Sequence, residues 1–368
     1  MKWLNYLRFS RPEPKRKPFS AWQIELTTRC PLRCRMCIRE KAKDWHGSDM
    51  SINDFKKLIP YLKDIETVVL EGWGESLLHK NLIEVIRLVR GVNGPQVGFV
   101  TSGHGLNEDY ISELINAGTD FIGFSFAGAT DWTHDSIRIN SDFKMLINSI
   151  LSFNEMKIEK KLETPKLHIV YLMLKENIFE VPMLLGIAKA IGIEEVVLTN
   201  LIHVINRWQD EQKIFTCTDR ESYKEIINEA EIKAQELKIK LRLPSVSPRY
   251  VPVCEENPLR NLYISVEGEV SPCVYLYPPI PSPFKRIFCE NEYHIEKVSF
   301  GNIFREPFHT IWNTKKYTEF RKCFMLRKRR FDEIYSYLWD IERLIRLKMS
   351  SLPDPPELCK TCHKMLGL

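Results

Sequence analysis

Residues 27–40 read TTRCPLRCRMCIRE and place Cys30, Cys34 and Cys37 in the spacing C-x3-C-x2-C. The three cysteines follow directly after an apolar run at 22–26, which predicts a strand. In βα folds, the loops that follow the strands form the face that carries chemistry. Three thiolates can hold three irons of a cubane iron–sulfur cluster and leave the fourth iron without a protein ligand. An open coordination position is typical of a catalytic metal site.

The alternatives for this loop are a zinc knuckle and a set of buried structural cysteines. Structural zinc is held by a closed set of four ligands, and no fourth ligand lies near Cys37 in the sequence. The N-terminus lacks the apolar core and cleavage site of a signal peptide, and no stretch approaches 18 consecutive apolar residues. We therefore expect a cytoplasmic chain without a membrane span. In that compartment the spacing of the ten cysteines indicates metal binding rather than a disulfide framework.

Apolar runs alternate with longer amphipathic stretches from residue 21 onward. The predicted strands are 22–26, 67–71, 96–101, 121–126, 167–172 and 195–198, and the predicted helices between them are 52–62, 82–89, 108–117, 143–156 and 180–190. Gly118 and Gly192 stand where helices are expected to end, each before a strand. Six strands that are each followed by a helix predict an α/β fold of right-handed βαβ units with a parallel sheet.

The length of 368 residues, 44% of them hydrophobic, indicates one large domain and a smaller one. We expect a basic arm at 1–20, a barrel at 21–215, a helical linker at 216–250 and a second, α+β domain at 251–368. Within the last two parts, helices are predicted at 221–237 and 321–349, and strands at 262–266 and 270–272. In the arm, 3–7 is either a short helix or part of a charged linker. A net charge of +5 gives no strong case for nucleic acid as a partner.

The cysteine loop, at the head of six βα units, resembles the signature of the radical S-adenosylmethionine superfamily. The resemblance covers about residues 20–210 and implies a partial (β/α)6, TIM-like barrel. It implies that the amino and carboxylate groups of S-adenosylmethionine bind the open iron of a 4Fe-4S cluster. An electron from a reductant such as ferredoxin or flavodoxin would then cleave the cofactor to a 5′-deoxyadenosyl radical, which abstracts a substrate hydrogen.

Two motifs after the second and third predicted strands are similar to cofactor-binding motifs of the family. Residues 71–75 read EGWGE, in which Gly74 and Glu75 match the Gly-Gly-Glu motif that holds the methionine amino group, while Trp73 replaces a glycine. Residues 101–103 read TSG, in which Ser102 replaces the asparagine of a ribose contact. An ordinary turn is the alternative at both places.

After the fourth predicted strand, Ser125 matches a ribose or carboxylate contact of the family, and Ala127 stands in place of the family's aspartate. The stretch THDSIR at 133–138 implies that Arg138 pairs with the methionine carboxylate, a role suited to a guanidinium. His134 is interpreted as a structural helix residue. Met36 resembles an apolar adenine contact, and Leu198 and Asn177 are weaker cofactor candidates. The sequence designates no catalytic residue.

A second cysteine set consists of Cys254, Cys273, Cys359 and Cys362. Four ligands from distant segments form a closed site, either for structural zinc or for a 4Fe-4S cluster. Residues 300–322 between them, FGNIFREPFHTIWNTKKYTEFRK, resemble the SPASM and twitch extensions of radical enzymes. Because the sequence ends soon after Cys362, the resemblance implies the shorter twitch form with one auxiliary cluster.

Cys217, Cys289 and Cys323 are left over, and we expect them to be buried or free thiols, although one of them could replace a ligand of the second set. Residues 327–330, RKRR, open a charged helix, which is either a solvated face or a surface for an acidic substrate or protein partner.

The resemblance implies a radical enzyme that modifies a peptide, a protein or a cofactor precursor. An arm of about 20 residues leaves no room for a leader-peptide recognition domain, which weakens a peptide-maturase role. One alternative is oxidation of a small molecule such as an aminocyclitol or a sugar. Another is a non-catalytic iron–sulfur electron carrier, against which the open three-cysteine site and the motifs around it argue.

Overall fold

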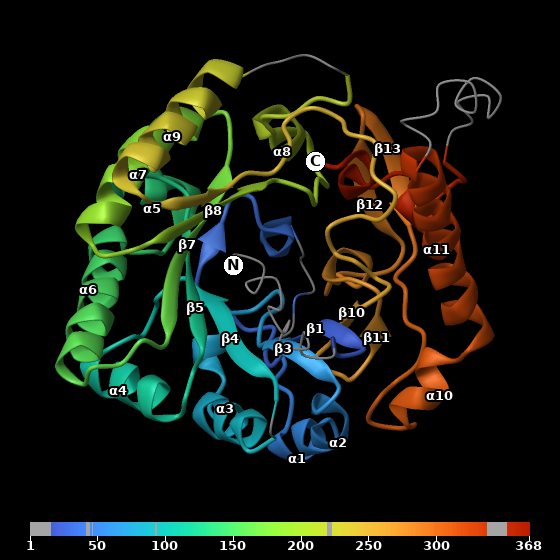
Figure 1. Ribbon diagram of the computed structural model, residues 1–368, viewed down its shortest axis with the longest axis horizontal. Coiled ribbons are helices and arrows are strands. Elements are labelled where there is room, and N and C mark those ends of the chain that lie inside the picture. Colours follow the sequence, from blue (N-terminus) through green and yellow to red (C-terminus); the bar gives the residue numbers. More distant parts are fainter. Residues whose placement is uncertain (1–15, 42–44, 46, 93, 219–222, 337–351) are drawn as a thin grey trace, which may run out of the picture.

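The computed structural model describes residues 16–368 except 42–44, 46, 93, 219–222 and 337–351. Six parallel strands form the centre of one curved sheet (Figure 1). In sheet order they are β1 (Phe19–Ile24), β3 (Ile65–Val69), β4 (Gln96–Thr101), β5 (Phe121–Phe126), β7 (Lys166–Met173) and β8 (Glu195–Asn200). Chain order equals sheet order, as expected for consecutive βα units. The predicted partial barrel is confirmed, and β4 and β5 have the predicted bounds.

Helices cover the outer face of this sheet (Figure 1). They are α1 (Ile52–Lys56), α2 (Ile59–Leu62), α3 (Leu82–Arg90), α4 (Glu108–Asn116), α6 (Phe143–Glu159) and α7 (Val181–Ala190), with α9 (Lys224–Leu237) packed beside α7. Gly118 and Gly192 follow α4 and α7 with φ of 84° and 76°, so both predicted helix ends are confirmed.

Two features of the barrel differ from the sequence prediction. The helix predicted at 52–62 is split into α1 and α2, because Pro60 in the first turn of α2 has no N–H to continue a helix from α1. A further helix, α5 (Asp131–Ile137), follows β5, with the Thr130 side chain accepting a hydrogen bond from the Thr133 N–H at its start. Its seven residues are too few for a clear helical period.

The sheet also continues beyond the six strands on both sides. β9 (Lys240–Arg242) pairs with β8, while β10 (Asn261–Ile264) pairs in parallel with β1 and carries β11 (Val270–Ser271) at the edge. The predicted strand at 262–266 therefore lies inside the barrel sheet. A period of two residues indicates a strand but not the strand with which it pairs. The sequence therefore led to the prediction that this strand belongs to a separate domain.

An aromatic cluster joins the outer face of β1 to the C-terminal part of the chain. Trp22 is fully buried, and its ring lies 4.7 Å from that of Phe308, on α10 (Phe308–Trp312). Phe19 contacts both Phe308 and Trp312, with ring centroids 5.5 and 5.0 Å apart. Aromatic rings bury large apolar areas, so α10 takes the place that a barrel helix would occupy over β1.

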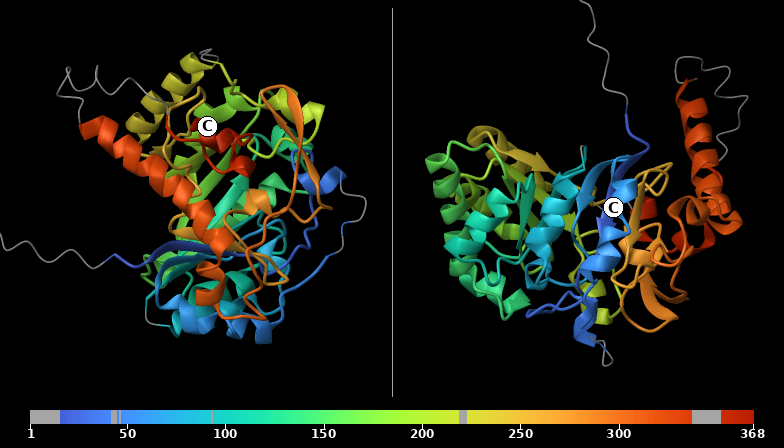
Figure 2. Two further views of the ribbon diagram at one scale, coloured as in Figure 1. Left: turned by 90° about the vertical axis from the view of Figure 1, so that its right-hand side faces the viewer. Right: turned by 90° about the horizontal axis from the view of Figure 1, so that it is seen from below.

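The C-terminal part contains a hairpin and a long helix. The hairpin consists of β12 (Phe284–Phe288) and β13 (Asn291–Ile295), and the helix is α11 (Lys315–Ser336), which extends away from the barrel in the right-hand view of Figure 2. The helix predicted at 321–349 begins earlier than expected. Its end, and the short helix considered at 3–7, lie outside the described residues.

A disulfide joins Cys217 to Cys289. The expectation that both were buried or free thiols is therefore wrong. Cys289 and Glu290 form the two-residue turn between β12 and β13 with φ of 48° and 68°, the conformation of a tight hairpin turn. Cys217 and Cys289 are 72 residues apart in the sequence, so no local pattern indicated that they pair. Cys323 is a free thiol, as expected.

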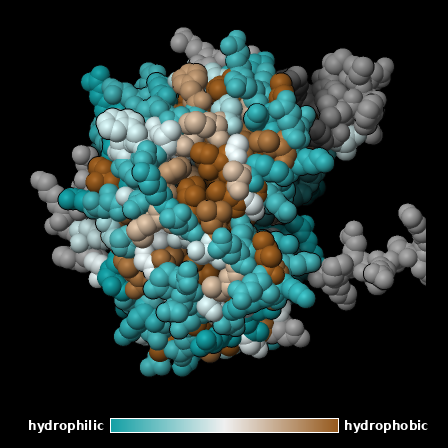
Figure 3. All heavy atoms as spheres, turned by 90° about the vertical axis from the view of Figure 1, so that its left-hand side faces the viewer, coloured by the Kyte–Doolittle hydropathy of each residue, from teal (hydrophilic) through white to brown (hydrophobic). Residues whose placement is uncertain are grey.

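One face of the molecule carries exposed apolar side chains. Figure 3 shows them gathered near the centre of the face on which α6, α7 and α9 lie. On these helices Leu151, Ile158, Met183 and Ile232 are exposed. In the part of the chain that the structure describes, no helix is both long and apolar enough to cross a membrane.

Candidate active site

The loop with Cys30, Cys34 and Cys37 begins six residues after β1 ends and is fixed by a short strand pair. β2 (Arg33–Cys34) pairs antiparallel with β6 (Arg138–Ile139), and Cys34 stands opposite Arg138. The Cys37 N–H donates to the Cys34 carbonyl at 2.9 Å. This pairing brings the carboxyl end of β1 and the helix after β5 to one place.

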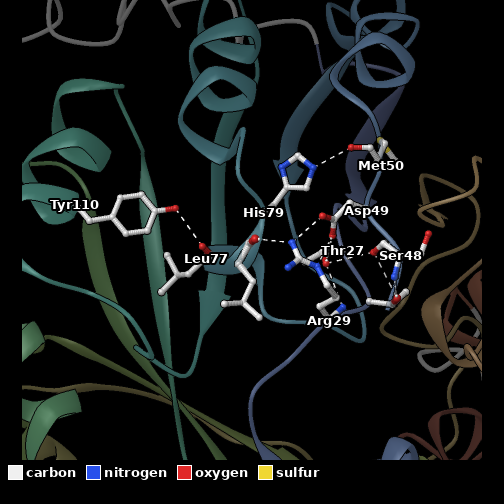
Figure 4. Close-up of polar contacts among 10 residues, drawn as sticks. Thr27, Arg29, Ser48, Asp49, Met50, Leu77, His79 and Tyr110 are labelled. Carbon is white, nitrogen blue, oxygen red and sulfur yellow. Dashed lines mark hydrogen bonds and ion pairs between the residues drawn. The ribbon is translucent and has the colours of Figure 1, made fainter. Parts of the chain in front are cut away.

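Polar contacts fix the residues that precede Cys30 (Figure 4). The Arg29 guanidinium donates to both carboxylate oxygens of Asp49, at 2.9 and 2.6 Å, and to the Leu78 carbonyl at 2.8 Å. The Thr27 hydroxyl donates to Asp49 at 2.6 Å. A fork of this kind gives geometric precision as well as energy, so the start of the cysteine loop is held against the segment after β3.

The three thiols lie close enough to interact. Burial raises the pKa of Cys37 to about 12, and the nearby Cys34 and Cys30 raise it further, while Arg39 opposes them. Burial also raises the pKa of Cys34, and Arg138 opposes this. Buried thiols with no other bonding role suit a ligand that binds thiolates and supplies positive charge. Among the described residues, no three His, Cys, Asp or Glu side chains lie at the spacing that a single metal ion requires.

The EGWGE loop packs directly on the cysteine loop. The Glu75 N–H donates to the Arg29 carbonyl at 2.8 Å. A Cβ at Gly74 would stand 2.7 Å from the Arg29 carbonyl oxygen and closer still to that of Thr27. Only glycine allows this approach of two backbones, which gives the glycine predicted at this position a physical reason.

Glu75 connects the loops after β3 and β4. Its buried carboxylate accepts hydrogen bonds from the Thr101 hydroxyl at 2.7 Å, the Ser102 N–H at 2.8 Å and the Ser102 hydroxyl at 2.7 Å. The structure thus brings the predicted residues Glu75 and Ser102 together, beside the cysteine loop. The Ser102 side chain binds Glu75 in this state, and its ribose contact stays a prediction.

The other predicted cofactor residues lie at different depths. Met36 packs on a small apolar cluster that includes Ile287. Ser125 is partly buried on β5, whereas Leu198 is only 2% exposed within the main core. Asn177 is fully buried and has a structural role: it accepts from the Leu174 N–H and donates to the Ala127 and Leu172 carbonyls.

His134 also has the structural role that the sequence indicated. Its Nδ1 accepts a hydrogen bond from the Ala127 N–H, and its ring lies edge-on to that of Phe126. Burial lowers its pKa to about 3, with Arg138 adding to the effect, so the ring is neutral.

The second cysteine set also converges. Cys254 and Cys273 come from either side of β10, and Cys359 and Cys362 come from the C-terminal segment. Burial raises the pKa of Cys254, Cys273 and Cys359, and the thiols of the set add to one another's effect. The chain therefore contains an open set of three thiols and a closed set of four.

Two family models match the parts of the chain that contain the two thiol sets. The family model of the radical SAM superfamily matches residues 24–188, which contain the open set. A second family model, of the SPASM iron–sulfur cluster-binding domain, matches 254–363, which contain the closed set. The chain belongs to the radical SAM superfamily. It is a radical SAM enzyme with a SPASM domain, and its cofactors are S-adenosylmethionine and iron–sulfur clusters.

Relatives of this radical SAM enzyme include proteins with assigned roles. The tungsten-containing aldehyde ferredoxin oxidoreductase cofactor-modifying protein of Pyrococcus furiosus is 24% identical over 310 residues, which are 81% of this chain and 82% of the relative. The PqqA peptide cyclase of Bradyrhizobium diazoefficiens is 29% identical over 115 residues, 31% of this chain and 30% of the relative.

Solved structures share the fold. SuiB of Streptococcus suis bound to S-adenosylmethionine superposes with a TM-score of 0.61 at 13% identity, covering 83% of this chain and 70% of that one. The structure described as native anSMEcpe with bound AdoMet has a TM-score of 0.57 at 15% identity, covering 81% and 82% of the two chains. At such identities the likeness shows the fold alone.

In the radical SAM domain, Arg138 gives a testable prediction. Its Nε is buried and has no hydrogen-bond partner among the described residues, although the guanidinium lies beside Cys34. A carboxylate ligand would satisfy it. We expect Arg138→Met to raise the KM for S-adenosylmethionine by about 10- to 100-fold, with Arg138→Lys intermediate, because one buried charged hydrogen bond contributes about 1.5–3 kcal/mol. Steady-state formation of 5′-deoxyadenosine measures this, and an unchanged KM in the Met variant contradicts the role.

The sequence prediction missed Glu25, which links the radical SAM and SPASM parts. Its carboxylate accepts from the Trp73 N–H at 2.7 Å and from the Val266 N–H at 3.4 Å. Burial raises its pKa from 4.5 to about 7, opposed by these N–H groups and by Tyr263. An acidic residue at the end of a buried strand, five positions before Cys30, was the available signal.

Glu25 predicts a pH dependence of stability. Because its pKa is higher in the folded chain, its contribution is fully present below about pH 4.5 and is lost as the pH rises through about 7. The shift corresponds to about 3 kcal/mol. We expect the difference in unfolding free energy between Glu25→Gln and the unaltered protein to change by up to this amount between pH 5 and pH 8, measured by urea unfolding. Glu84→Gln, on the exposed face of α3, is the control, and parallel curves contradict the prediction.

The sequence also missed a group of rings between the two thiol sets. The His203 ring lies 5.3 Å from that of Trp73 in the EGWGE loop and stacks 6.3 Å from that of Tyr275, two residues after Cys273. His203 Nε2 and Trp73 Nε1 are both buried without a hydrogen-bond partner among the described residues. Burial lowers the pKa of His203 to about 3, with Arg286 adding to it, so the ring is neutral.

A cavity of about 180 Å³ lies inside the sheet near the closed set. Its walls come from β1, β3 and β10, and they include Gln23, Glu71, Glu256 and Cys273. Burial raises the pKa of Glu71 to about 7, and Glu256 and Glu75 add to this. The Glu71 and Glu256 carboxyl groups and Cys273 of the closed set therefore line the same cavity.

Proposed function

We propose that this radical SAM enzyme modifies a peptide, a protein or a cofactor precursor, with its substrate held between the two thiol sets. The observation that carries the proposal is the path of contacts from one set to the other. Trp73 belongs to the loop that packs on the open set, it contacts His203, and His203 stacks on Tyr275 beside the closed set. The loops that carry the two thiol sets are therefore connected by contacting rings, and we place the substrate beside these rings.

The open set would hold the 4Fe-4S cluster that binds S-adenosylmethionine, and the cofactor supplies radical hydrogen abstraction when bound. Gly74, Glu75, Ser102, Ser125, Arg138, Met36 and Leu198 are the proposed residues around the cofactor. Arg138 and Glu75 have the strongest structural support, because they lie beside the cysteine loop and provide charges there. Cys254, Cys273, Cys359 and Cys362 would hold one auxiliary 4Fe-4S cluster.

Support for the substrate class comes from the relatives. The relative aligned over most of both chains is named for modifying a cofactor, and others are named as cyclases of a peptide. A macromolecular or precursor substrate of this kind fits a site between two domains, where loops shape the pocket. We further propose that the chain acts in the cytoplasm with ferredoxin or flavodoxin as reductant. The division into 1–20, 21–215, 216–250 and 251–368 stays a proposal, in which β9 and β10 of the last two parts complete the barrel sheet.

Anaerobic reconstitution with iron and sulfide tests the function. The reduced protein should contain about eight irons per chain and convert S-adenosylmethionine to 5′-deoxyadenosine. Peptides and precursor proteins encoded beside the gene are the candidate substrates, and a mass change in one of them would identify the target. No 5′-deoxyadenosine from the fully loaded protein would exclude the enzymatic role, and about four irons would exclude the auxiliary cluster.

A further inference from the structure

Two buried arginines connect the segments that carry the closed cysteine set. The first is Arg286 on β12, which is 4% exposed. Its guanidinium donates to the Leu358 carbonyl at 3.1 Å and to the Tyr275 carbonyl at 3.4 Å. Leu358 directly precedes Cys359, and Tyr275 follows Cys273 by two residues. One side chain therefore ties together two of the thiol-bearing segments.

The second is Arg327 on α11, which is 7% exposed. It donates from Nε to the Pro252 carbonyl at 3.0 Å, from one terminal nitrogen to the Val251 carbonyl at 2.9 Å, and from the other to the Pro353 carbonyl. Residues 251 and 252 lead into Cys254, and Pro353 begins the segment that leads to Cys359. Arg327 thus connects a different pair of segments, so the two arginines together bridge all the parts that contribute thiols.

Neither guanidinium forms an ion pair with a carboxylate within the described residues. Burying a cation is expensive unless an anion or a dense set of hydrogen bonds compensates it. The carbonyl groups give partial compensation only. Four thiolates around an iron–sulfur cluster carry net negative charge, and both guanidinium groups bind backbone carbonyls next to these thiols.

We propose that Arg286 and Arg327 are positioning residues of the auxiliary cluster, which hold its three cysteine-bearing segments at the required spacing and stabilise its reduced state. The inference rests on the proposed ligand set. The reduced cluster carries one more negative charge than the oxidised one, so nearby positive charge raises its midpoint potential. The RKRR stretch thus has two different roles, since Arg327 faces the metal site while Arg329 is exposed and pairs with Glu333.

Substitutions of each arginine in the reconstituted, two-cluster protein distinguish its two proposed roles, which are holding the cysteine segments in place and providing positive charge near the cluster. The variants are Arg286→Met, Arg286→Lys, Arg327→Met and Arg327→Lys. Matched controls are Lys285→Met on β12 and Arg329→Met on α11, which each remove an exposed cation from the same element. A redox titration followed by electron paramagnetic resonance gives the midpoint potential of each cluster. Iron release to a chelator gives the retention of the auxiliary cluster.

We expect the Met variants to have a more negative auxiliary potential, an unchanged potential of the S-adenosylmethionine-binding cluster, and about tenfold faster loss of auxiliary iron. The Lys variants should regain the potential but not the retention, because an ammonium cannot bridge two or three carbonyls in fixed geometry. A Met variant that loses both clusters cannot be interpreted by itself, and the Lys variant at the same position is then compared. If that Lys variant retains auxiliary iron as well as the unaltered protein does, the positioning role is contradicted.

The inference is overturned if the Met variants keep wild-type potential and retention, or if the controls show the same changes. The result is distinct from failure of the proposed function. An unaltered protein that has only one cluster, or forms no 5′-deoxyadenosine, defeats the function first. An unaltered protein with two clusters and normal cleavage, alongside unaffected arginine variants, defeats only the inference.

Discussion

Replacing Cys34 with alanine is expected to reduce 5′-deoxyadenosine formation to background and to lower the iron content from about eight to about four per chain. Cys34 is the most buried thiol of the open set, and its backbone is fixed by the pairing of β2 with β6. Cluster binding would therefore fail at this site, while the closed set stays filled.

Iron analysis and electron paramagnetic resonance of the remaining cluster measure this result, together with an assay of S-adenosylmethionine cleavage. Cys323→Ser, on α11, is the comparison variant: Cys323 lies near Cys359 of the closed set, so cleavage at the open set should be unchanged. If Cys34→Ala retains cleavage, the open set has been assigned wrongly. If it loses all iron, the two sites depend on one another, and the expectation that the closed set stays filled is wrong.

Glu75→Ala should have the second largest effect, on both stability and activity. The carboxylate satisfies the Thr101 hydroxyl and both hydrogen-bonding groups of Ser102, and all of these donors would be left in a buried site. Each unsatisfied buried group costs about 1–3 kcal/mol, so we expect a loss of roughly 3–5 kcal/mol in unfolding free energy. Because the Glu75 N–H also holds the Arg29 carbonyl, distortion of this loop should reach the cysteine loop.

Thermal and chemical unfolding measure the stability change, and the KM for S-adenosylmethionine measures the effect on the site. Glu75→Gln retains the size of the side chain but replaces one acceptor oxygen by a donor, so it should lie between Ala and the unaltered protein. Glu84→Gln on the exposed surface serves as a control for loss of a carboxylate. A Glu75→Ala protein with unchanged stability would contradict the described hydrogen-bond network.

Much of the fold was predictable because it depends on local patterns. Strands such as β4 and β5 are apolar runs of fixed length, and Gly118 and Gly192 mark helix ends by their backbone requirements. The pairing of β10 with β1 was not predictable in the same way, because Ala21 and Asn261 are separated by 240 residues. Neither segment has a sequence feature that identifies the strand with which it pairs.

In the candidate site, too, the features that depend on local patterns were predictable and those that depend on distant contacts were not. Cysteines with short spacing are visible in the sequence, as is a glycine needed for close contact such as Gly74. Glu25, His203 and Arg286 were missed, because their roles come from contacts with residues far away in the sequence. A single buried Glu or Arg has no local sequence pattern. The Cys217–Cys289 pair could be recognised only from the position of the β12–β13 hairpin in the structure.

The parallel pairing of β10 with β1 also decides what happens to a shortened chain. A fragment that ended before residue 261 would leave β1 as an unprotected sheet edge, with free N–H and C=O groups along its length. It would also leave the Trp22 ring without Phe308. During synthesis β1 lacks this neighbour until residues 261–264 have been made, so association with other chains competes with folding throughout that interval.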